Sequence, residues 1–482
     1  MAEGVVRGTV RRNAYADSVT LLQVTSTVAA RPGVVDASLV MATELNREVL
    51  RDSGLLFAEA SAAGPNDLVI AIRGQDSATA EAAVESAERL LAERRPATQT
   101  DQARQAPRSI RSARRGQPEA NLAVISVPGP YAAAEARQAL AEGLHVFLFS
   151  DNVSLQDEIE LKQRARDQGL LVMGPDCGTA ILNGIGLGFA NVVRKGGTGL
   201  IGASGTGIQE VSSLLDRAGV GISHAIGTGG RDLHEQVGAV TTLQALELLR
   251  DDPSTDTIVL ISKPPAVAVA SKVLRAAASV GKPVVACLLG ATLDAPAGVQ
   301  LASNLYQAAR LAAPSGDWSS VGPEGLPRLR RREDQDQVRA LYCGGTLCDE
   351  AELAIGHDGG HQFVDFGDDQ YTRGRAHPMI DPTLRNQAIV AAAHDPRVAV
   401  LLLDVILGYG AHADPAGAVA AVVRHAIGDA GRPLAVLAHV VGTKTDPQGL
   451  QRQEQMLQDA GVALFGSNHH AAVAAGLLVE SA

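Results

Sequence analysis

A β-α-β unit with two glycine-rich loops, at residues 199–232, constrains the fold of this chain more than any other stretch. An apolar strand leads into the first loop, a helix ends near Gly219, and a second strand at 222–226 leads into the second loop. Ligands bind at the carboxyl ends of parallel strands, where helix N-termini offer free N–H groups to an anion. The alternative is a pair of tight turns without a ligand. We predict a phosphate site at Ser204, Gly205, Thr206, Gly207, Gly227, Thr228, Gly229 and Gly230.

The composition predicts an α/β protein of several domains. A length of 482 residues suggests about three domains, and 50 glycines with 3% aromatic residues are typical of sheets joined by tight turns. The net charge of −11 argues against nucleic-acid binding. The chain has no basic apolar leader and no run of 18 apolar residues, so we expect a cytoplasmic protein without membrane contact.

The cysteines predict structural thiols and no metal site. The four cysteines form no Cys-x-x-Cys pair, and the spacing of Cys343 and Cys348 is a weak metal signal.

Two polar stretches, 96–118 and 314–337, are expected to be linkers, because they contain proline and charged residues and few apolar ones. An alternative for the arginine-rich first linker is a basic arm that contacts an acidic partner surface. Residues 1–95 precede it, and their order of strands and helices predicts a small α+β ferredoxin-like domain with a regulatory or assembly role. After residue 118, apolar strands alternate with amphipathic helices, which predicts doubly wound parallel sheets.

Other loops at expected strand ends supply candidate substrate-binding residues. A strand at 170–173 leads into one loop, a strand at 338–342 precedes a helix expected at 348–355, and a strand at 398–404 ends in a third. We predict substrate contacts from Asp176, Cys177, Gly344, Gly345, Thr346, Asp404 and Tyr409.

The segment 363–386 is unusually rich in charged side chains. Arg373 and Arg375 can grip carboxylate or phosphate oxygens bidentately, and His377 can donate to a carbonyl oxygen as charge develops on it. The carboxylates of the segment can hold the arginines or bind Mg²⁺ as a cofactor. The alternative is a surface loop held by its own ion pairs. The predicted catalytic residues are Arg373, Arg375, His377 and His412, the last from the end of a neighbouring strand.

Residues 119–310 resemble the alpha subunit of succinyl-CoA synthetase and its NDP-forming acyl-CoA synthetase relatives. The resemblance lies in Val127-Pro128, Gly174-Pro175-Asp176-Cys177-Gly178, Ser204-Gly205-Thr206 and Gly227-Thr228-Gly229-Gly230. Nearly the whole chain resembles the FdrA family, through GASGTGIQEVSSLLDRAGVGISHAIGTGGRDL, MGPDCGTAILNG and FVDFGDDQYTRGRAHPMIDPTLRN. These resemblances imply a Rossmann-like domain of the CoA-binding type at 119–195 and flavodoxin-like ligase-type domains at 196–313 and 338–482.

The FdrA resemblance implies a role in allantoin and purine nitrogen catabolism. It points to oxamate carbamoyltransferase activity with partner subunits, in which carbamoyl phosphate and oxamate give oxalurate and phosphate. The expected ligands are carbamoyl phosphate or another acyl phosphate and a small carboxylate or amide, and we also expect a homo-oligomer.

Two departures limit the comparison with the synthetases. Their phosphorylatable histidine follows the last strand of this region, whereas residues 290–303 contain no histidine. Their N-terminal glycine-rich turn for CoA has no visible counterpart before residue 95. Two alternatives to carbamoyl transfer therefore stay open. One is an NDP-forming acyl-CoA ligase subunit whose histidine and nucleotide domain lie on a partner, and the other is a non-catalytic subunit that senses a phosphorylated metabolite.

Overall fold

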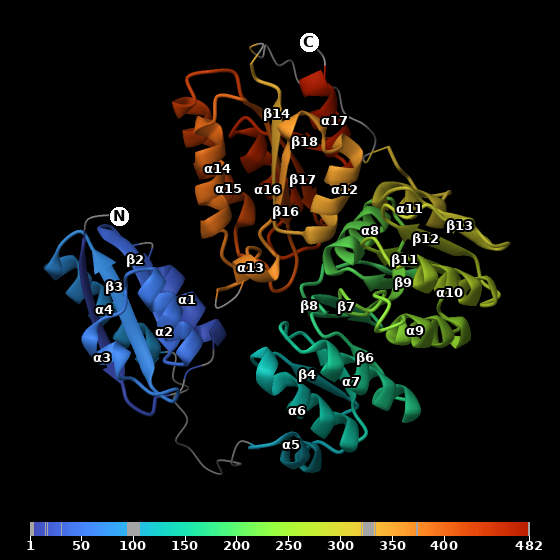
Figure 1. Cartoon of the computed structure of the whole chain (residues 1–482), viewed down its shortest axis with the longest axis horizontal. Helices are drawn as coiled ribbons and strands as arrows, with labels where there is room; N and C mark the ends of the chain where they lie inside the picture. The colour runs from blue at the N-terminus through green and yellow to red at the C-terminus, as the bar shows by residue number, and fades with distance from the viewer. Residues whose placement is uncertain are drawn as a thin grey trace. The chain divides into compact units, whose positions relative to one another are not determined.

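The computed structural model describes residues 4–14, 16, 18–29, 31–93, 107–319, 321, 332, 334–372 and 375–480. The chain divides into two compact units, 1–106 and 107–482 (Figure 1). No helix in the described ranges is long and apolar enough to cross a membrane.

The first unit is a three-stranded antiparallel sheet with helices on both faces. Its strands lie in the order β1 (Val5–Arg11), β3 (Leu68–Gly74), β2 (Val34–Met41). Alternate residues of β3 enter two different cores. Ile70 and Ile72 pack with α1 (Ser18–Ala29) and α4 (Ser77–Glu93) in the first core, and Val69 and Ala71 lie in the second core. That second core is formed by α2 (Glu44–Asp52) and α3 (Ala58–Ser61). The unit thus has a second helical layer that the expected ferredoxin-like sandwich lacks.

The second unit begins with α5 (Ile110–Gly116), inside the stretch expected to be a linker, and a small parallel sheet. The strands are β4 (Leu122–Ile125), β5 (His145–Leu148) and β6 (Val172–Met173), in that order. They are connected by α6 (Gly129–Ala141) and α7 (Leu155–Asp167). The Ser154 side chain caps α7 by accepting a hydrogen bond from the Asp157 backbone N–H.

The central sheet of the second unit has seven strands in the order β13-β12-β11-β9-β10-β7-β8. Five are parallel: β9 (Lys195–Ala203), β10 (Ile222–Gly227), β11 (Thr257–Ser262), β12 (Val284–Leu288) and β13 (Val299–Leu301). The hairpin β7 (Thr179–Leu182) and β8 (Ile185–Gly188) adds an antiparallel edge. The helices are α8 (Gly205–Arg217), α9 (Val240–Asp251), α10 (Val267–Ala278) and α11 (Leu305–Ala312).

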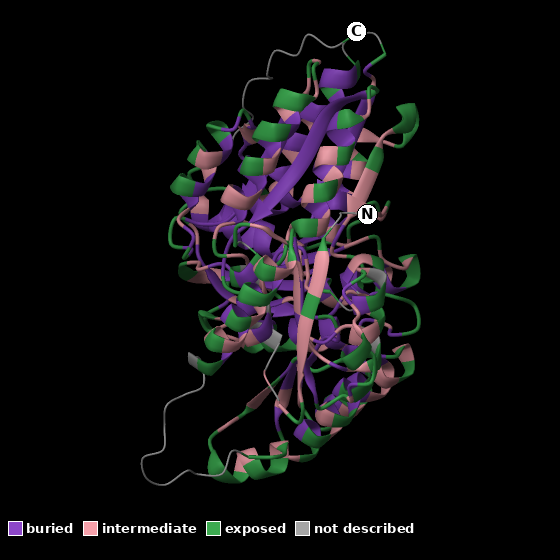
Figure 2. Cartoon of the chain, turned by 90° about the vertical axis from the view of Figure 1, so that its left-hand side faces the viewer, coloured by how far each residue is buried: buried purple, intermediate pink, exposed green. Residues whose placement is uncertain are grey.

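The third sheet of the unit is fully parallel, in the order β15-β14-β16-β17-β18. Its strands are β14 (Gln337–Tyr342), β15 (Gln362–Asp365), β16 (Val398–Ile406), β17 (Ala435–Val441) and β18 (Ala463–Phe465). Its helices are α12 (Gly345–Ile355), η1 (Asp358–Gly360), α13 (Asp369–Thr372), α14 (Thr383–His394), α15 (Pro415–Asp429), α16 (Leu450–Gln458) and α17 (Asn468–Glu480). Every residue of β16 is buried, and Figure 2 shows the buried strands as a purple layer between helices with exposed outer faces.

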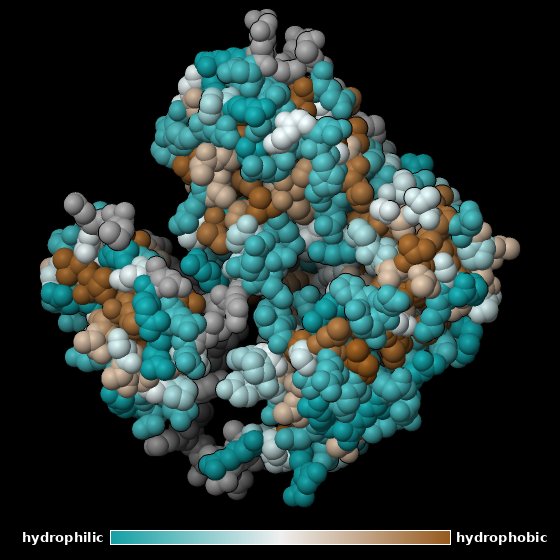
Figure 3. Space-filling view, in the orientation of Figure 1, coloured by the Kyte–Doolittle hydropathy of each residue, from teal (hydrophilic) through white to brown (hydrophobic). Residues whose placement is uncertain are grey.

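One hydrophobic core joins the central sheet to the third sheet. It contains Val211 and Leu214 of α8 together with Leu347 and Ala351 of α12. Trp318, within the second expected linker, is also buried in this core, so part of that stretch is packed. Large exposed apolar side chains are scattered over separate elements, and the face drawn in Figure 3 is mostly hydrophilic with smaller apolar patches.

Candidate active site

The N-termini of two helices from different sheets meet in the second unit. Helix α8 starts after β9, and its N-cap Ser204 accepts a hydrogen bond from the Gly207 N–H. Helix α12 starts at Gly345, three residues before the predicted start. The Ser204 Oγ and Thr346 Oγ1 atoms are 2.6 Å apart. The first predicted loop therefore faces the N-terminus of α12. Gly345 and Thr346, two of the residues predicted to bind substrate, lie in the first turn of that helix.

Glycine at 344 is what lets the two helices approach. A Cβ atom added at Gly344 would lie 2.9–3.0 Å from the side-chain atoms of Thr206. Within the described part of the chain, no side chain caps α12. The first N–H groups of α12 therefore add to those of Gly205 and Thr206 as donors for an anion.

Lys263 places its ammonium group where the two helices meet. We did not predict this residue from the sequence. It follows β11, the strand that pairs with β9, so it emerges beside Ser204. Its Nζ atom lies 3.5 Å from Asp349 Oδ2 and 3.9 Å from Asp365 Oδ2. A Cβ atom added at Gly345 would collide with Lys263 Nζ and Asp365 Oδ2. The position of a lysine at the end of a central parallel strand was the signal available in the sequence.

Carboxyl groups surround the lysine. Burial raises the pKa of Asp365 to about 6, an effect that Lys263 and the Gly367 N–H oppose. The protein atoms packed around the Asp176 carboxyl group, together with the charges of Asp369 and Asp151, raise its pKa to about 7. The residue as a whole is exposed, so water screens part of this effect. The site therefore combines two helix N-termini and an ammonium group with carboxyl groups whose pKa values are raised toward neutrality.

The second glycine-rich loop differs from the first. Its Gly229 adopts φ +85° and packs against the Gly174–Pro175 turn, where a Cβ atom would collide with the Pro175 carbonyl oxygen. This loop does not lead directly into a helix, and the Asp232 carboxylate accepts the first N–H groups of α9, from Thr241 and Thr242. The N-terminus of α9 is thus already occupied by a protein carboxylate.

A buried charge network fixes this second loop. Lys162 Nζ donates to Glu158 Oε1, to the Thr228 carbonyl oxygen and to Asp232 Oδ1 at 2.7–2.9 Å, and both ion pairs are fully buried. Of the predicted residues in this loop, Gly227 lies under the 174–179 loop and Gly230 lies near the Asp176 carboxylate. Phosphate binding by Gly227, Thr228, Gly229 and Gly230 remains a prediction, with fewer open donors than in the first loop.

The Asp404 carboxylate holds the loop before α12 in place and does not point into the site. Its two carboxylate oxygens accept the N–H groups of Cys343 and Gly344 at 2.8 Å, and Arg385 Nη1 donates to it at 2.9 Å. Asp404 is fully buried. Substrate binding by Asp404 stays a prediction, and in this structure the two N–H groups that hold the start of α12 in place occupy its oxygens.

Cys177 is likewise unsuited to contact a substrate. It is buried, and burial raises the pKa of its thiol to about 12, so the thiolate is not available near neutral pH. Its thiol packs near Gly227, where a Cβ atom would lie 2.5 Å from Sγ. Substrate contact by Cys177 therefore stays a prediction that its burial does not favour, and in this structure the thiol has a packing role.

His377 lies next to the site. Its Nδ1 accepts the Met379 N–H, which places the proton of the neutral ring on Nε2, and burial lowers its pKa to about 4. A Cβ atom added at Gly367 would lie 2.8 Å from this Nε2 and 3.0 Å from Asp365 Oδ1. His377 thus presents an N–H donor on the same side of Gly367 as the carboxylate that contacts Lys263.

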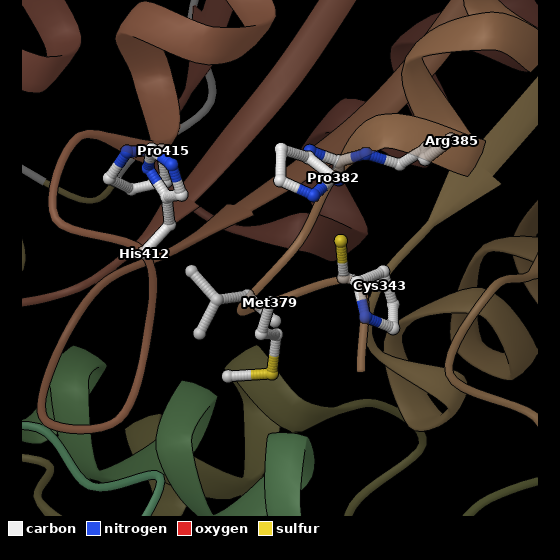
Figure 4. Close-up of a pocket in the computed structure, with 8 residues that line it drawn as sticks. Cys343, Met379, Pro382, Arg385, His412 and Pro415 are labelled. Carbon is white, nitrogen blue, oxygen red and sulfur yellow. The ribbon is translucent and has the colours of Figure 1, made fainter. Parts of the chain in front are cut away.

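The other predicted catalytic residues are placed differently. Arg375 is exposed and Arg373 lies outside the described residues. His412 accepts the Asp414 N–H and, with Cys343, Met379 and Arg385, lines a cavity of about 10 Å³ behind the site (Figure 4). This cavity has room for no more than about one water molecule.

Tyr409 is exposed and pairs through its backbone with Ala190 beside the β7–β8 hairpin. No group of three or more His, Cys, Asp or Glu side chains within the described ranges is placed to hold a metal ion.

Three family models match the chain. Residues 4–107 match one described as AllF, heavy metal-associated domain, residues 193–290 match a CoA binding domain, and residues 341–478 match CoA-ligase. The segment 4–107 contains no cysteine and no histidine. It therefore lacks the thiolate and imidazole ligands that heavy metals prefer, and its residues do not fit such an ion. The CoA binding match overlaps the segment that we expected to be ligase-type.

Several relatives resemble the chain. YahF of Escherichia coli K12 is 44% identical over 502 residues, which cover 96% of each chain. A succinate–CoA ligase [ADP-forming] subunit alpha of Methanothermobacter thermautotrophicus is 30% identical over 190 residues, 38% of this chain and 61% of that one. An alpha 2 subunit of Archaeoglobus fulgidus is 28% identical over 149 residues, 30% of this chain and 50% of that one. The chain thus spans about half to three-fifths of these alpha subunits.

Among solved structures, the apo form of the dinucleotide-forming acetyl-coenzyme A synthetase 1 of Ca. Korarchaeum cryptofilum is 18% identical. That match covers 74% of this chain and 82% of the synthetase, with a TM-score of 0.34.

The parallel sheets, the CoA-ligase match and the alpha-subunit relatives define an α/β protein of the acyl-CoA-synthetase-like class. Within that class, the chain belongs to the family of YahF, with which it shares 44% identity over nearly the whole length of both proteins.

Proposed function

We propose that this chain is a subunit of an acyl-CoA-synthetase-like enzyme and binds the phosphoryl group of an acyl phosphate where α8 and α12 meet. The observation that carries the proposal is the contact of Ser204 with Thr346, which joins two helix N-termini. Lys263 adds a positive charge at the same place. Uncapped N–H groups and an ammonium are the donors that a phosphoryl group requires.

The reaction that fits this site is acyl transfer with phosphate as the leaving group. A nucleophile attacks the acyl carbon, the bond from that carbon to the phosphate oxygen breaks, and inorganic phosphate leaves with the bonding electron pair. The His377 Nε2–H is a donor for the acyl oxygen as it gains negative charge. The CoA binding domain and CoA-ligase matches support the CoA thiol as the nucleophile.

Carbamoyl transfer to oxamate is the second candidate. The absence of histidine from residues 290–303 favours it, because an acyl-CoA ligase that forms a nucleoside diphosphate needs a phosphorylatable residue. In the ligase reading, that residue and the nucleotide site lie on a partner subunit. The resemblance of the sequence to the FdrA family supports this candidate, because that resemblance implies oxamate carbamoyltransferase activity.

Product analysis separates the candidates. The purified chain is incubated with acetyl phosphate and CoA, and separately with carbamoyl phosphate and oxamate. Phosphate, acyl-CoA and oxalurate are measured, alone and with co-purifying subunits. Acyl-CoA formation is the expected result, and oxalurate formation would instead establish carbamoyl transfer. Phosphate binding without either product would contradict a catalytic role and favour a sensor. His377→Gln is expected to lower kcat roughly 100-fold in the productive assay, as for the loss of one donor to a developing oxyanion.

A further inference from the structure

We propose that Lys263 binds the phosphoryl group directly and makes the site selective for a dianionic phosphoryl compound over a free carboxylic acid. This inference rests on the proposed phosphoryl site, and it assigns a specificity-determining residue to it. Lys263 is neither part of a glycine-rich loop nor of either helix N-terminus.

The sheet fixes where the lysine emerges. Ser262, the last residue of β11, is in register with Ala203 at the end of β9, so Lys263 and Ser204 leave the sheet side by side. The lysine side chain then reaches the other helix, because an added Cβ atom at Gly345 would collide with its Nζ. One ammonium group therefore lies beside the starts of both α8 and α12.

The contacts of the ammonium group leave it available to a ligand. Its distances of 3.5 Å to Asp349 and 3.9 Å to Asp365 exceed the 2.7–3.2 Å of a good N–H···O hydrogen bond. The Lys263 side chain is 41% exposed. By contrast, Lys162 makes three contacts of 2.7–2.9 Å and is fully buried. Lys162 is therefore a structural lysine, whereas Lys263 keeps donors for a bound oxyanion.

The charge arrangement favours a dianion. Two helix N-termini and an ammonium group place positive potential on one point, while Asp349 and Asp365 oppose the entry of any anion. Because Coulomb energy scales with the charge of the ligand, a phosphoryl dianion gains about twice as much from Lys263 as a carboxylate gains, and the same factor applies to its repulsion by Asp349 and Asp365. In the proposed direct contact the ammonium group is nearer to the ligand than either carboxylate, so the attraction is the larger effect. Asp365 is held by the Gly367 N–H at 2.8 Å, which keeps the opposing carboxylate in place.

A different role for Lys263 makes a different prediction. If the lysine served only to neutralise Asp365, removal of both charges would restore anion binding. If the lysine contacts the phosphoryl group, the double variant Lys263→Met/Asp365→Asn stays weak, because no donor replaces the ammonium. Lys272→Met is the matched control, since Lys272 is a lysine of the same sheet region on α10 that donates to the Gly238 carbonyl oxygen.

The test is calorimetric titration of inorganic phosphate and of acetate at constant ionic strength. Wild type and Lys272→Met are expected to bind phosphate equally and more tightly than acetate. Lys263→Met is expected to weaken phosphate binding roughly 10- to 100-fold, as for a hydrogen bond between charged groups. Lys263→Arg is expected to recover part of that loss, and the double variant is expected to remain weak. Circular dichroism and melting temperature confirm that each variant is folded.

The possible failures are distinguishable. If Lys263→Met binds phosphate as wild type does while Gly345→Ala does not, the role of Lys263 is wrong and the proposed phosphoryl site stands. Recovery of wild-type affinity in the double variant also overturns the direct contact. If wild type itself does not bind phosphate, both proposals are wrong.

Discussion

Asp404 shows how a single buried carboxylate shapes the site without contacting a ligand. It accepts the N–H groups of Cys343 and Gly344 and pairs with Arg385, whose side chain is only 3% exposed. Burial raises the pKa of Asp404, and Arg385 and the two N–H groups oppose that rise. A charge in this position is tolerable only because all its partners are present.

We predict that Arg385→Met destabilises the protein by about 3–5 kcal/mol, because it leaves a buried carboxylate without its cation. Urea unfolding followed by circular dichroism measures the change, and Arg397→Met is the control, since Arg397 forms an exposed ion pair with Asp336. The control should lose no more than about 1 kcal/mol. Equal stability of the two variants would contradict the account of Asp404.

The sequence could place Asp404 at a strand end but could not reveal its partners. The strand at 398–404 was predictable from its apolar run, and the residue after such a run is often functional. The partners of Asp404 lie about 60 positions away in the loop after β14 and about 19 away on α14, and only the packed sheet brings them together. The same reason explains why Lys263 was missed.

Among the elements, α7 and the second glycine-rich loop are joined by a network of charged side chains. Lys162 of α7 ties the Thr228 carbonyl oxygen to Asp232, and Asp232 in turn caps α9. Arg231 adds a hydrogen bond to Glu158 at 2.9 Å. One network of charges thus ties α7 to the loop and to α9, which lie about 70 residues further along the chain.

We expect Lys162→Met to destabilise the second unit by about 3–5 kcal/mol, because Glu158 and Asp232 would remain buried without their cation. Thermal unfolding at neutral pH is the measurement, with Lys272→Met as the exposed control. A Lys162→Met variant as stable as its control would mean that the network contributes little to holding the loop.

At this scale the local patterns predicted most of the strands, whereas several short strands at the sheet edges and about half of the helices, including α14 to α17, were not predicted. The β-α-β unit at 199–232 was confirmed because glycine-rich turns and an amphipathic helix mark its boundaries. The β7–β8 hairpin was missed because its strands have only four residues each. The start of α12 was placed three residues late because two glycines preceded it, and glycine is a poor helix former.

Within the second unit, the central and third sheets are connected by a buried polar network near α8 and α12. His439 of β17 contacts Glu210 of α8 at 2.8 Å, and Glu210 also accepts the Asn468 N–H. The Asn468 side chain donates to Glu350 of α12 at 2.8 Å. These contacts hold the two helices in one arrangement, so the meeting of their N-termini depends on the packing of both sheets. No local pattern in the sequence predicts that packing.

The most direct test of the central claim is sulfate binding to wild type and Gly345→Ala, measured by calorimetry. A Cβ atom at position 345 collides with Lys263 and Asp365 at the start of α12. Gly428→Ala, on α15, is the matched control because a Cβ atom there meets open space. If the phosphoryl site lies where the two helices meet, Gly345→Ala binds sulfate at least tenfold more weakly than wild type, a difference of about 1.4 kcal/mol, and Gly428→Ala binds it normally. Equal affinity of folded Gly345→Ala and wild type would contradict the account.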